Sequence, residues 1–364
     1  MKLSNREIEA LVVGGAVLGG GGGGEAEGGR QRIELALKMG PVEILDIDQL
    51  DPDTWLLTVS GVGAISERRI FWAASHSVRA VQLMLKHSAL PIGGLISSEV
   101  GGGGVVHGWL PGAVLDLPVV DAPCNGRAHP TGAMGSMGLT AREDYVSLQA
   151  AVGGDPSRGE YIETFVKGQL STVAKLIRQA SVLAGGGVAV ARNPVRASYV
   201  KDHGAPGALQ RAIEVGKAIL ARQARGGEAM AEATAQALGG EIVAQGTVEV
   251  KKLDVTGGFG IGRVVVKGDD PTTYYELIFW NEYMTLERDG ERLGSFPDLI
   301  ATLSLDTGLA VGTGRIEEGN RVAVLHVPQD KLILGAGMKD LHLFKDVERA
   351  IGKEVIKYSF GSPS

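Results

Sequence analysis

Four side chains that commonly take part in catalysis lie in the segment Asp121-Ala-Pro-Cys124-Asn-Gly-Arg127-Ala-His129. Cys124 is the only cysteine of the chain, and a neighbouring Arg127 or His129 can lower the pKa of its thiol and favour the nucleophilic thiolate. We therefore predict that Cys124 is a nucleophile and that Asp121 and His129 transfer protons. Arg127, whose guanidinium can hold a carboxylate through two hydrogen bonds, and Asn125 are predicted to bind the substrate. The alternatives are that Cys124 is a small core residue and that Arg127 forms a surface salt bridge.

Glu99 and His107 flank a second segment of interest, Glu99-Val-Gly-Gly-Gly-Gly-Val-Val-His107. A loop without side chains leaves the acid at one end and the imidazole at the other free to reach a ligand. We predict that both residues bind the substrate. The structural alternative is that Glu99 caps the helix that follows and His107 lies on its surface.

Glycine makes up 55 of the 364 residues, and its longest run is Gly19 to Gly24. Backbone N–H groups clustered at a helix N-terminus bind anions. No Gly-Lys-Ser/Thr follows the run, so it is not a Walker A loop, and six consecutive glycines satisfy the dinucleotide-binding spacing trivially. We favour a close approach of the backbone to a small anionic substrate over nucleotide binding. Gly22 and Gly23, with Gly102 and Gly103 of the second glycine loop, are predicted to contact it.

A metal site is not required by the histidine spacing. The chain has seven histidines, with no HExxH motif. Asp121, His129, His107 and Glu99 could nevertheless converge on a divalent metal. We predict no cofactor and leave the divalent metal open.

Alternating helix and strand patterns indicate an α/β layer over residues 1–239, with a largely parallel sheet that carries the glycine loops. The third loop follows a short buried strand, and ligands of open α/β sheets bind beyond the carboxyl ends of the strands. The expected strands are 42–45, 55–60, 91–97 and 117–121, and the expected helices are 30–39, 75–86, 161–183 and 207–225, with 11–18 as a strand or the start of a helix.

Strand patterns alone follow between residues 240 and 327, separated by turn signals such as Gly268-Asp269-Asp270. This change predicts a small all-β module, a barrel or a sandwich, over residues 240–336. The segment 337–364 is expected to be helical and to pack back on the first domain.

The composition is that of an ordinary globular protein, with 44% hydrophobic and 21% charged residues. The net charge of −6 and the lack of Lys/Arg runs argue against a nucleic-acid partner. No apolar stretch reaches the roughly 18–20 residues of a membrane span, and the first residues do not form a secretory signal. One cysteine fits a reducing compartment. We expect a cytoplasmic enzyme with a small-molecule substrate that assembles as a homo-oligomer.

Several separated motifs occur in an order that is typical of one family. They are the early glycine loop, Glu99-Val-Gly-Gly-Gly, Leu117-Pro-Val-Val-Asp121-Ala with Gly126-Arg127-Ala-His-Pro130, Thr256-Gly-Gly-Phe-Gly-Ile-Gly262-Arg, Asn281-Glu282, Asp289-Gly290 and Phe296-Pro-Asp298-Leu-Ile300. With them the chain resembles the S-methyl-thiohydantoin desulfurase-domain family, which is associated with hydantoinases. The third loop departs from the family pattern Asp-Ala-Asp-Gly-Met-Gly-Arg-Ala-Phe-Pro-Glu, because Pro123, Cys124, His129 and Thr131 replace the second Asp, its Gly, the Phe and the Glu.

The resemblance implies a hydrolase that releases sulfide or a thiol from C2 of a thiohydantoin, such as the thiohydantoin-propionate of ergothioneine breakdown. In that reading the Cys124 thiolate attacks C2, sulfide leaves, and water resolves the adduct to the hydantoin. Arg127 then holds a ring carbonyl or the propionate.

Three other readings remain open. Water activated by a metal, or by Glu99 and Asp121, could attack directly. The chain could be a non-catalytic subunit of a hydantoinase-type complex. It could also be an acyl-phosphate or nucleotide enzyme that uses the glycine loops.

Overall fold

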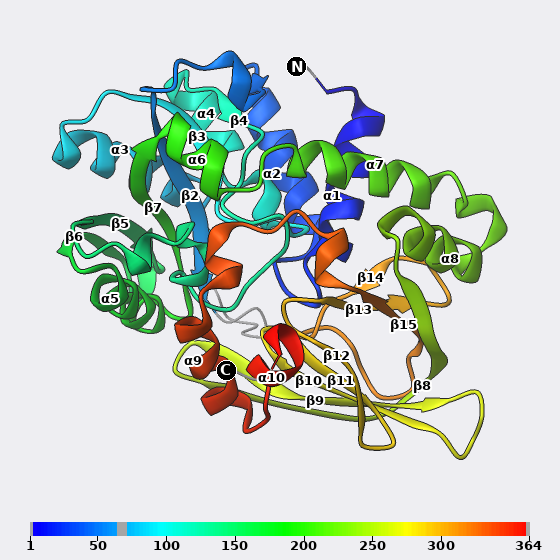
Figure 1. Cartoon of the computed structure of the whole chain (residues 1–364). Coiled ribbons are helices and arrows are strands. Elements are labelled where there is room, and N and C mark those ends of the chain that lie inside the picture. The colour runs from blue at the N-terminus through cyan, green and yellow to red at the C-terminus, as the bar shows by residue number, and fades with distance from the viewer. Residues whose placement is uncertain (1–2, 64–70, 362–364) are drawn as a thin grey trace.

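The computed structural model describes residues 3–63 and 71–361, which form two β-sheets with helices packed on and between them (Figure 1). Within this part of the chain, the first sheet has seven strands in the order β1 (Ile44–Leu45), β4 (Val119–Val120), β3 (Ile92–Ser97), β2 (Trp55–Gly63), β7 (Gly187–Arg196), β5 (Ser147–Gly153) and β6 (Ile162–Gly168). The strands from β1 to β2 are parallel, and β7, β5 and β6 are joined to β2 and to each other by antiparallel pairing. The sheet is therefore mixed, and only the half that carries the glycine loops is parallel as predicted.

The described helices range from one turn to four turns. They are α1 (Asn5–Leu18), α2 (Ala26–Met39), α3 (Ser75–Ser88), α4 (Trp109–Leu115), α5 (Leu170–Leu183), α6 (Ala197–His203), α7 (Ala208–Leu220), α8 (Gly227–Leu238), α9 (Leu341–Ile351) and α10 (Ile356–Phe360). None of the helices in residues 3–63 and 71–361 is long and apolar enough to cross a membrane.

Helices α3 and α5 cover opposite faces of the first sheet. Ala150 and Val152 of β5 share an apolar cluster with α3, whereas Ala151 between them packs with Val173 and Ile177 of α5. Successive side chains of a strand point to opposite faces, so this alternation assigns one helix to each face.

The predicted helix 161–183 begins later than expected. Its first residues form β6, which pairs with β5 at the edge of the sheet, and the helix starts at Leu170. The β-branched residues Ile162, Thr164 and Val166 alternate in this segment, and that spacing favours an edge strand over a helix turn.

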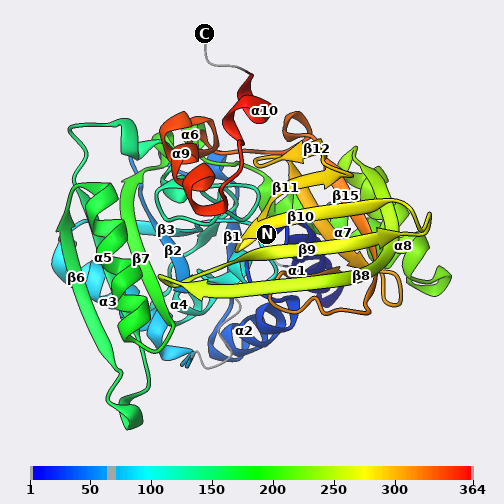
Figure 2. The ribbon, with the colours of Figure 1, turned by 90° about the horizontal axis from the view of Figure 1, so that it is seen from below.

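The second sheet is antiparallel and holds eight strands among the described residues (Figure 2). Their order is β12 (Glu291–Ser295), β11 (Glu282–Arg288), β10 (Tyr274–Trp280), β9 (Phe259–Gly268), β8 (Glu241–Thr256), β15 (Arg321–Val327), β13 (Leu299–Ser304) and β14 (Ala310–Val311). The strands lie inside the predicted 240–336 segment, but they form one open sheet with β12 and β14 at its edges rather than the small barrel or sandwich that we predicted.

Helices α1 and α7 explain why this sheet does not close into a barrel. Leu299, Ala301 and Leu303 of β13 point to a core that also contains Val12 of α1 and Ile213 of α7. The helices therefore cover the apolar face that a barrel would have turned inward. Glycines allow α1 and α7 to cross closely, because a Cβ atom at Gly14 or Gly216 would overlap the backbone of the other helix.

The C-terminal segment packs mainly on the second sheet, not on the first domain as expected. Phe344 and Val347 of α9 share an apolar cluster with Trp280 and Phe296 of the β-sheet region, and Met134 is the buried member from the first half of the chain. The physical reason is that Trp280 at the end of β10 and Phe296 after β12 present an apolar surface, which the apolar face of α9 buries.

Candidate functional site

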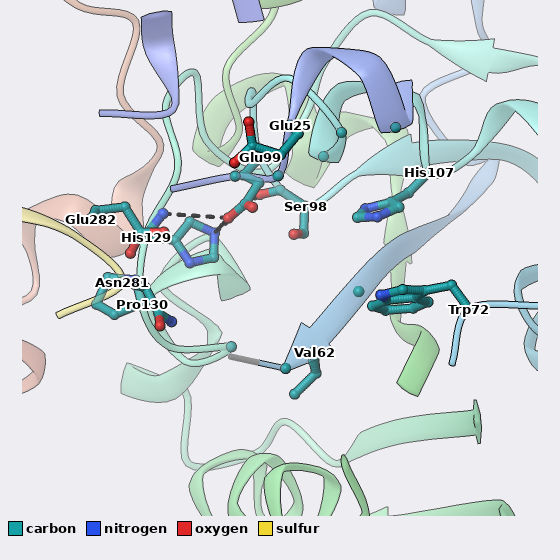
Figure 3. A pocket seen from close by; sticks show the side chains of 18 of the residues that line it. Glu25, Val62, Trp72, Ser98, Glu99, His107, His129, Pro130, Asn281 and Glu282 are labelled. Atoms are coloured by element: carbon teal, nitrogen blue, oxygen red, sulfur yellow. Dashed lines mark hydrogen bonds and ion pairs between the residues drawn. The ribbon is translucent and has the colours of Figure 1, made fainter. Parts of the chain in front are cut away.

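A cavity of about 500 Å³ lies beyond the carboxyl ends of β2 and β3 (Figure 3). Its walls come from both glycine loops, the loop 129–132, helices α2 and α5, strand β7 and the connection between β10 and β11. This is the place where open α/β sheets bind their ligands. The sequence analysis expected the site at this edge of the sheet, but it did not foresee that residues of the second sheet region, Asn281 and Glu282, form part of the cavity wall.

The two glycine loops pack backbone against backbone at the rim. The N–H groups of Gly103 and Gly104 donate hydrogen bonds of 3.1 and 2.8 Å to the carbonyl of Gly23. Gly23 has φ of +71°, and a Cβ atom there would lie 2.7 Å from the Cα of Gly101. Part of the glycine density therefore serves this close approach, which no side chain would allow.

Only some of the predicted substrate-binding glycines face the cavity. Gly23 and Gly103 line it, whereas Gly22 lines a smaller neighbouring cavity of about 180 Å³ and is covered by the Glu282 carboxyl group. Gly102 lies against the backbone of Gly24 and Ala26. The structure thus gives Gly22 and Gly102 packing roles.

Glu99 and His129 come together inside the cavity. The backbone N–H of His129 donates a 3.3 Å hydrogen bond to Oε2 of Glu99, and Nε2 of its imidazole lies 3.5 Å from the same oxygen. That Nε2 is also 3.2 Å from the carbonyl of Ser98. Two acceptor oxygens beside Nε2 place the ring proton there, so the imidazole holds the carboxylate as a donor.

Burial changes the protonation of both groups. It raises the pKa of Glu99 to about 7, although the His129 N–H and the charge of Arg192 act in the opposite direction. Burial lowers the pKa of His129 to about 4, so the imidazole is neutral at neutral pH. A carboxylate with a pKa near 7 is suited to act as a general base.

Arg192 brings an uncompensated positive charge to the cavity wall. It is 3% exposed, its Nε is buried without a hydrogen-bond partner, and among the described residues its guanidinium forms no ion pair. A bulge in the pairing of β2 with β7 directly follows it, where Asn193 has φ of +51°. Such bulges re-aim side chains, and Gly132 leaves room for the guanidinium.

Arg178 of α5, by contrast, has its donors occupied. It donates hydrogen bonds to the carbonyls of Gly63, Gly258 and Pro130 at 3.1, 2.9 and 3.2 Å. It also stacks on the ring of Phe259, at 4.0 Å from its centroid. Arg178 therefore fastens the loops of both sheets at the rim of the cavity.

A second carboxyl group, Glu282, enters from the β10–β11 connection. Burial and the nearby charge of Glu99 hold its pKa well above the ordinary range, and Oε2 is buried without a hydrogen-bond partner among the described residues. The connection is fixed by Asn281, which has φ of +58° and accepts a 2.9 Å hydrogen bond from Gly260. Figure 3 shows Glu282 beside His129 and Glu99.

The predicted nucleophile Cys124 does not reach the cavity. It is 1% exposed, belongs to an apolar cluster with Leu56 and Ile96, and its Sγ lies 3.3 Å from Oγ1 of Thr58. Burial raises the pKa of its thiol to about 11, which opposes the thiolate that we expected. The structure gives Cys124 the surroundings of a core residue, which was the alternative reading of the sequence.

The other members of the third loop are engaged in holding the fold together. The carboxylate of Asp121 accepts hydrogen bonds of 2.7 and 3.0 Å from the N–H groups of Leu209 and Gln210, in the first turn of α7. The side-chain amide of Asn125 donates a 2.8 Å hydrogen bond to the carbonyl of Arg127 and accepts a 3.0 Å hydrogen bond from the backbone N–H of Gly335. Neither Asp121 nor Asn125 lines the cavity.

Arg127 links the third loop to the second sheet. Its guanidinium donates to the carbonyls of Ala128, Pro297 and Asp298 and lies 4.6 Å from the ring centroid of Phe296. It is fully buried behind the cavity, where its charge lowers the pKa of Glu99 and Glu282. Arg127 does not line the cavity, so its position does not fit the predicted role as the substrate anchor.

His107 does line the cavity, together with Trp72 and Arg32. Burial lowers the pKa of His107 to about 3, and Arg32 and Arg192 add to this effect. Sequence reasoning did not select Trp72, Arg32, Arg178 or Arg192. Arg32 follows the first glycine loop in α2, and the other three are far from the three loops in the sequence. Glu282 stood only as part of a resemblance motif, and that was the one signal for it.

A metal site is not evident in residues 3–63 and 71–361, where no group of three or more His, Cys, Asp or Glu side chains could hold an ion. Of the four residues considered for a metal, Glu99, His107 and His129 face the cavity and Asp121 does not.

Comparison with known proteins identifies the family and the fold. The model of the S-Me-THD-like N-terminal domain matches residues 6–154, and that of the S-Me-THD-like C-terminal domain matches residues 169–338. A crystal structure of a protein from Chromobacterium violaceum has the same fold, with a TM-score of 0.71, 21% identity, and coverage of 97% of this chain and 98% of that chain. Among curated proteins, none has a sequence that matches this chain. The two domain models together span most of the sequence, and the chain therefore belongs to the S-Me-THD-like family.

Proposed function

We propose that the cavity is the active site of a hydrolase that releases sulfide, or a thiol, from C2 of a thiohydantoin ring. Family membership supports the substrate class. The observation that carries the proposal is Glu99, a cavity-facing carboxylate with a pKa near 7, beside the unpaired guanidinium of Arg192. This pair supplies a base and a positive charge in one cavity.

The reaction needs only water as co-reactant. Glu99 takes a proton from a water molecule as the water oxygen bonds to C2 of the ring. In a 2-thioxo ring the electrons of the C=S bond move to sulfur, and in an S-methyl ring the electrons of the C2=N bond move to the ring nitrogen, which takes up a proton. In the collapse of the tetrahedral intermediate the C–S bond breaks as sulfur takes a proton, and the new hydroxyl group loses its proton to solvent, so that C2 becomes a carbonyl. A 2-thioxo ring gives hydrogen sulfide, and an S-methyl ring gives methanethiol. A positioned general base contributes roughly 10²- to 10⁴-fold to such a step.

Arg192 is placed to stabilise the negative charge that develops on the former thiocarbonyl sulfur. A preorganised charge in a desolvated site costs no reorganisation during the reaction, and losing one such donor lowers kcat by about 10²- to 10³-fold in other enzymes. Its lack of any partner in the described residues supports this role, because a buried charge is otherwise expected to be paired.

Glu282 is suited to return the proton to sulfur. Its raised pKa keeps the carboxyl group protonated at neutral pH, so it can donate a hydrogen bond and then a proton to the leaving group. Glu99 and Glu282 then form a base and acid pair whose different roles follow from their environments. The proton that Glu99 gains from water restores Glu282 through solvent after each turnover.

This route replaces the covalent one predicted from the sequence. Cys124 lies outside the cavity with a raised thiol pKa, and Asp121 is engaged with α7. Of the two carboxylates considered for water activation, Glu99 alone faces the cavity. His129 serves as a positioning residue that holds Glu99 through its N–H groups.

A product assay tests the proposal. The purified chain is incubated with 2-thiohydantoin, S-methyl-thiohydantoin and hydantoin, and sulfide, methanethiol and the oxo ring are quantified. We expect catalytic release of sulfide or methanethiol with one oxo ring formed for each sulfur lost. Ring opening of hydantoin without sulfur release, or no turnover by the chain alone, would overturn the proposal and favour a hydantoinase-type reaction or a non-catalytic subunit.

A further inference from the structure

We infer that Arg32, His107 and Trp72 form a subsite that binds a carboxylate carried by the substrate outside its reacting ring. The inference rests on the proposed function for the identity of the ring, and it deepens that function by naming the residues that select the substituent. All three side chains line the same cavity as Glu99.

Arg32 is a cation whose charge is not neutralised by a described residue. Burial lowers the pKa of its guanidinium, and among residues 3–63 and 71–361 it forms no hydrogen bond and no ion pair. Its guanidinium lies over the ring of Trp72, whose centroid is 5.6 Å from Cζ. The neighbouring Arg30 on the same helix, in contrast, is bound by Glu9 and Glu27. A desolvated guanidinium without a counter-charge is ready for an anionic ligand.

The guanidinium of Arg32 packs against Gly103 at the cavity wall. A Cβ atom at Gly103 would lie 2.9 Å from Nη1 of Arg32, so the glycine lets the guanidinium lie close to the backbone of the second glycine loop. Gly103, which we predicted to contact the substrate directly, thus also makes room for the guanidinium of Arg32.

His107 and Trp72 complete the subsite. At Gly61 a Cβ atom would lie 3.0 Å from the Trp72 ring and 3.3 Å from Nε2 of His107, so both rings lie against this glycine. His107 is neutral at neutral pH and therefore offers one N–H donor without adding a second full charge. The indole of Trp72 gives a flat apolar wall for a short aliphatic arm.

The charge of the cavity favours a carboxylate over a phosphate. Four arginines and four glutamates of the described residues line the cavity: Arg32, Arg178, Arg192, Arg315, Glu25, Glu27, Glu99 and Glu282. Arg178 is bound to backbone carbonyls and Arg315 faces Glu25 at 4.0 Å, which leaves Arg32 as the free charge at this end. One free guanidinium with a neutral imidazole matches a monoanion with two planar oxygens.

The subsite lies across the cavity from the reacting groups. In Figure 3, His107 and Trp72 are on one side, and Glu99, His129 and Glu282 are on the other. A ring held at Glu99 can therefore extend an acidic arm toward Arg32.

Turnover and binding measurements test the subsite separately from the reaction. Turnover is measured with 2-thiohydantoin that carries a carboxyethyl arm at C5, with its primary amide, and with the unsubstituted ring. Binding of the corresponding carboxyethyl hydantoin is measured by calorimetry. We expect the wild type to prefer the acid over the amide. Arg32→Gln should lower kcat/KM for the acid by roughly 10- to 100-fold, because a charge-assisted hydrogen bond to the substrate is lost. The loss should appear as a higher KM and not as a lower kcat. The amide and the unsubstituted ring should be turned over as before, and Arg32→Lys should retain part of the preference.

Arg315→Gln is the matched control, because Arg315 lines the same cavity but is exposed and faces Glu25. It should leave the acid-to-amide ratio unchanged. An acid-to-amide ratio that survives in Arg32→Gln overturns the subsite, even if sulfide release is confirmed. If no thiohydantoin is turned over, the proposed reaction fails, but calorimetry still tests the subsite. Binding of the carboxyethyl hydantoin that is lost in Arg32→Gln supports the subsite. Binding that does not depend on Arg32, or no binding at all, overturns the subsite.

Discussion

The Glu99 carboxylate receives both N–H groups of one residue, because the backbone N–H of His129 lies 3.3 Å and its imidazole Nε2 3.5 Å from the same oxygen. The glycine-rich second loop supplies the acid and the third loop supplies the histidine. Their contact orients the carboxylate without neutralising it, since the imidazole is neutral at neutral pH. This relationship defines the proposed base, and the predictions below concern its neighbours and its titration.

Replacement of Cys124 by alanine should leave catalysis intact. The thiol is buried outside the cavity, so we expect kcat/KM within about twofold of wild type and a loss of about 1 kcal/mol in the free energy of unfolding. Turnover and urea unfolding measure the two effects. A folded Cys124→Ala protein without activity would restore the covalent route.

Arg192→Met should separate activity from stability. The substitution removes the charge proposed to stabilise the departing sulfur, so kcat/KM should fall at least about 100-fold. The free energy of unfolding should stay the same or rise, because a buried charge without a partner is replaced by an apolar chain of similar length. An active variant, or one that unfolds at a lower urea concentration, contradicts the role assigned to this guanidinium.

The pH dependence of kcat/KM should follow the ionisation of Glu99. Because a base must be deprotonated to accept a proton, the rate should fall about tenfold for each pH unit below about 7 and level off above it. Arg192 lowers the pKa of Glu99, so residual activity of Arg192→Met should require a higher pH than wild type. A profile that stays flat down to pH 5 is incompatible with Glu99 as the base.

Asp121 should matter for folding and not for the chemical step. Its carboxylate accepts two N–H groups in the first turn of α7, so Asp121→Ala should cost about 1–2 kcal/mol in the free energy of unfolding. We expect kcat to be unchanged for the folded fraction. A large loss of kcat with unchanged unfolding would return Asp121 to the active site.

The sequence predicts local features of this protein better than the joining of distant segments. Glu99, His107 and His129 were selected because each stands in or beside a loop that follows a strand, and all three line the cavity. Cys124 was misjudged because sequence neighbours such as Arg127 do not report which way a side chain points, and both residues face away from the cavity. The helix and strand patterns also located the eight-stranded sheet within 240–336, but not its open form.

The remaining cavity residues could not be found from spacing. Arg32, Arg178 and Arg192 stand on α2, α5 and β7, and nothing local distinguishes them from surface arginines. What marks Arg32 and Arg192 is the lack of a counter-charge after burial, which depends on the packing of both sheets. The bulge that aims Arg192 likewise arises from its pairing with β2.

Activity of Glu99→Gln, measured as sulfide release, tests the central claim most directly. Glutamine keeps the shape and can still accept from His129, but it cannot take a proton from water, so kcat should fall at least about 1,000-fold. Burial raises the pKa of Glu99 in the folded state above its value in the unfolded state. The protonated carboxyl group therefore adds to the free energy of unfolding at acid pH, and this contribution is lost as the pH rises through about 7. Above pH 7 the variant should therefore be at least as stable as wild type. Glu27→Gln, which changes an exposed carboxylate of the same cavity, should remain fully active. A folded Glu99→Gln protein that releases sulfide at the wild-type rate would contradict the proposal.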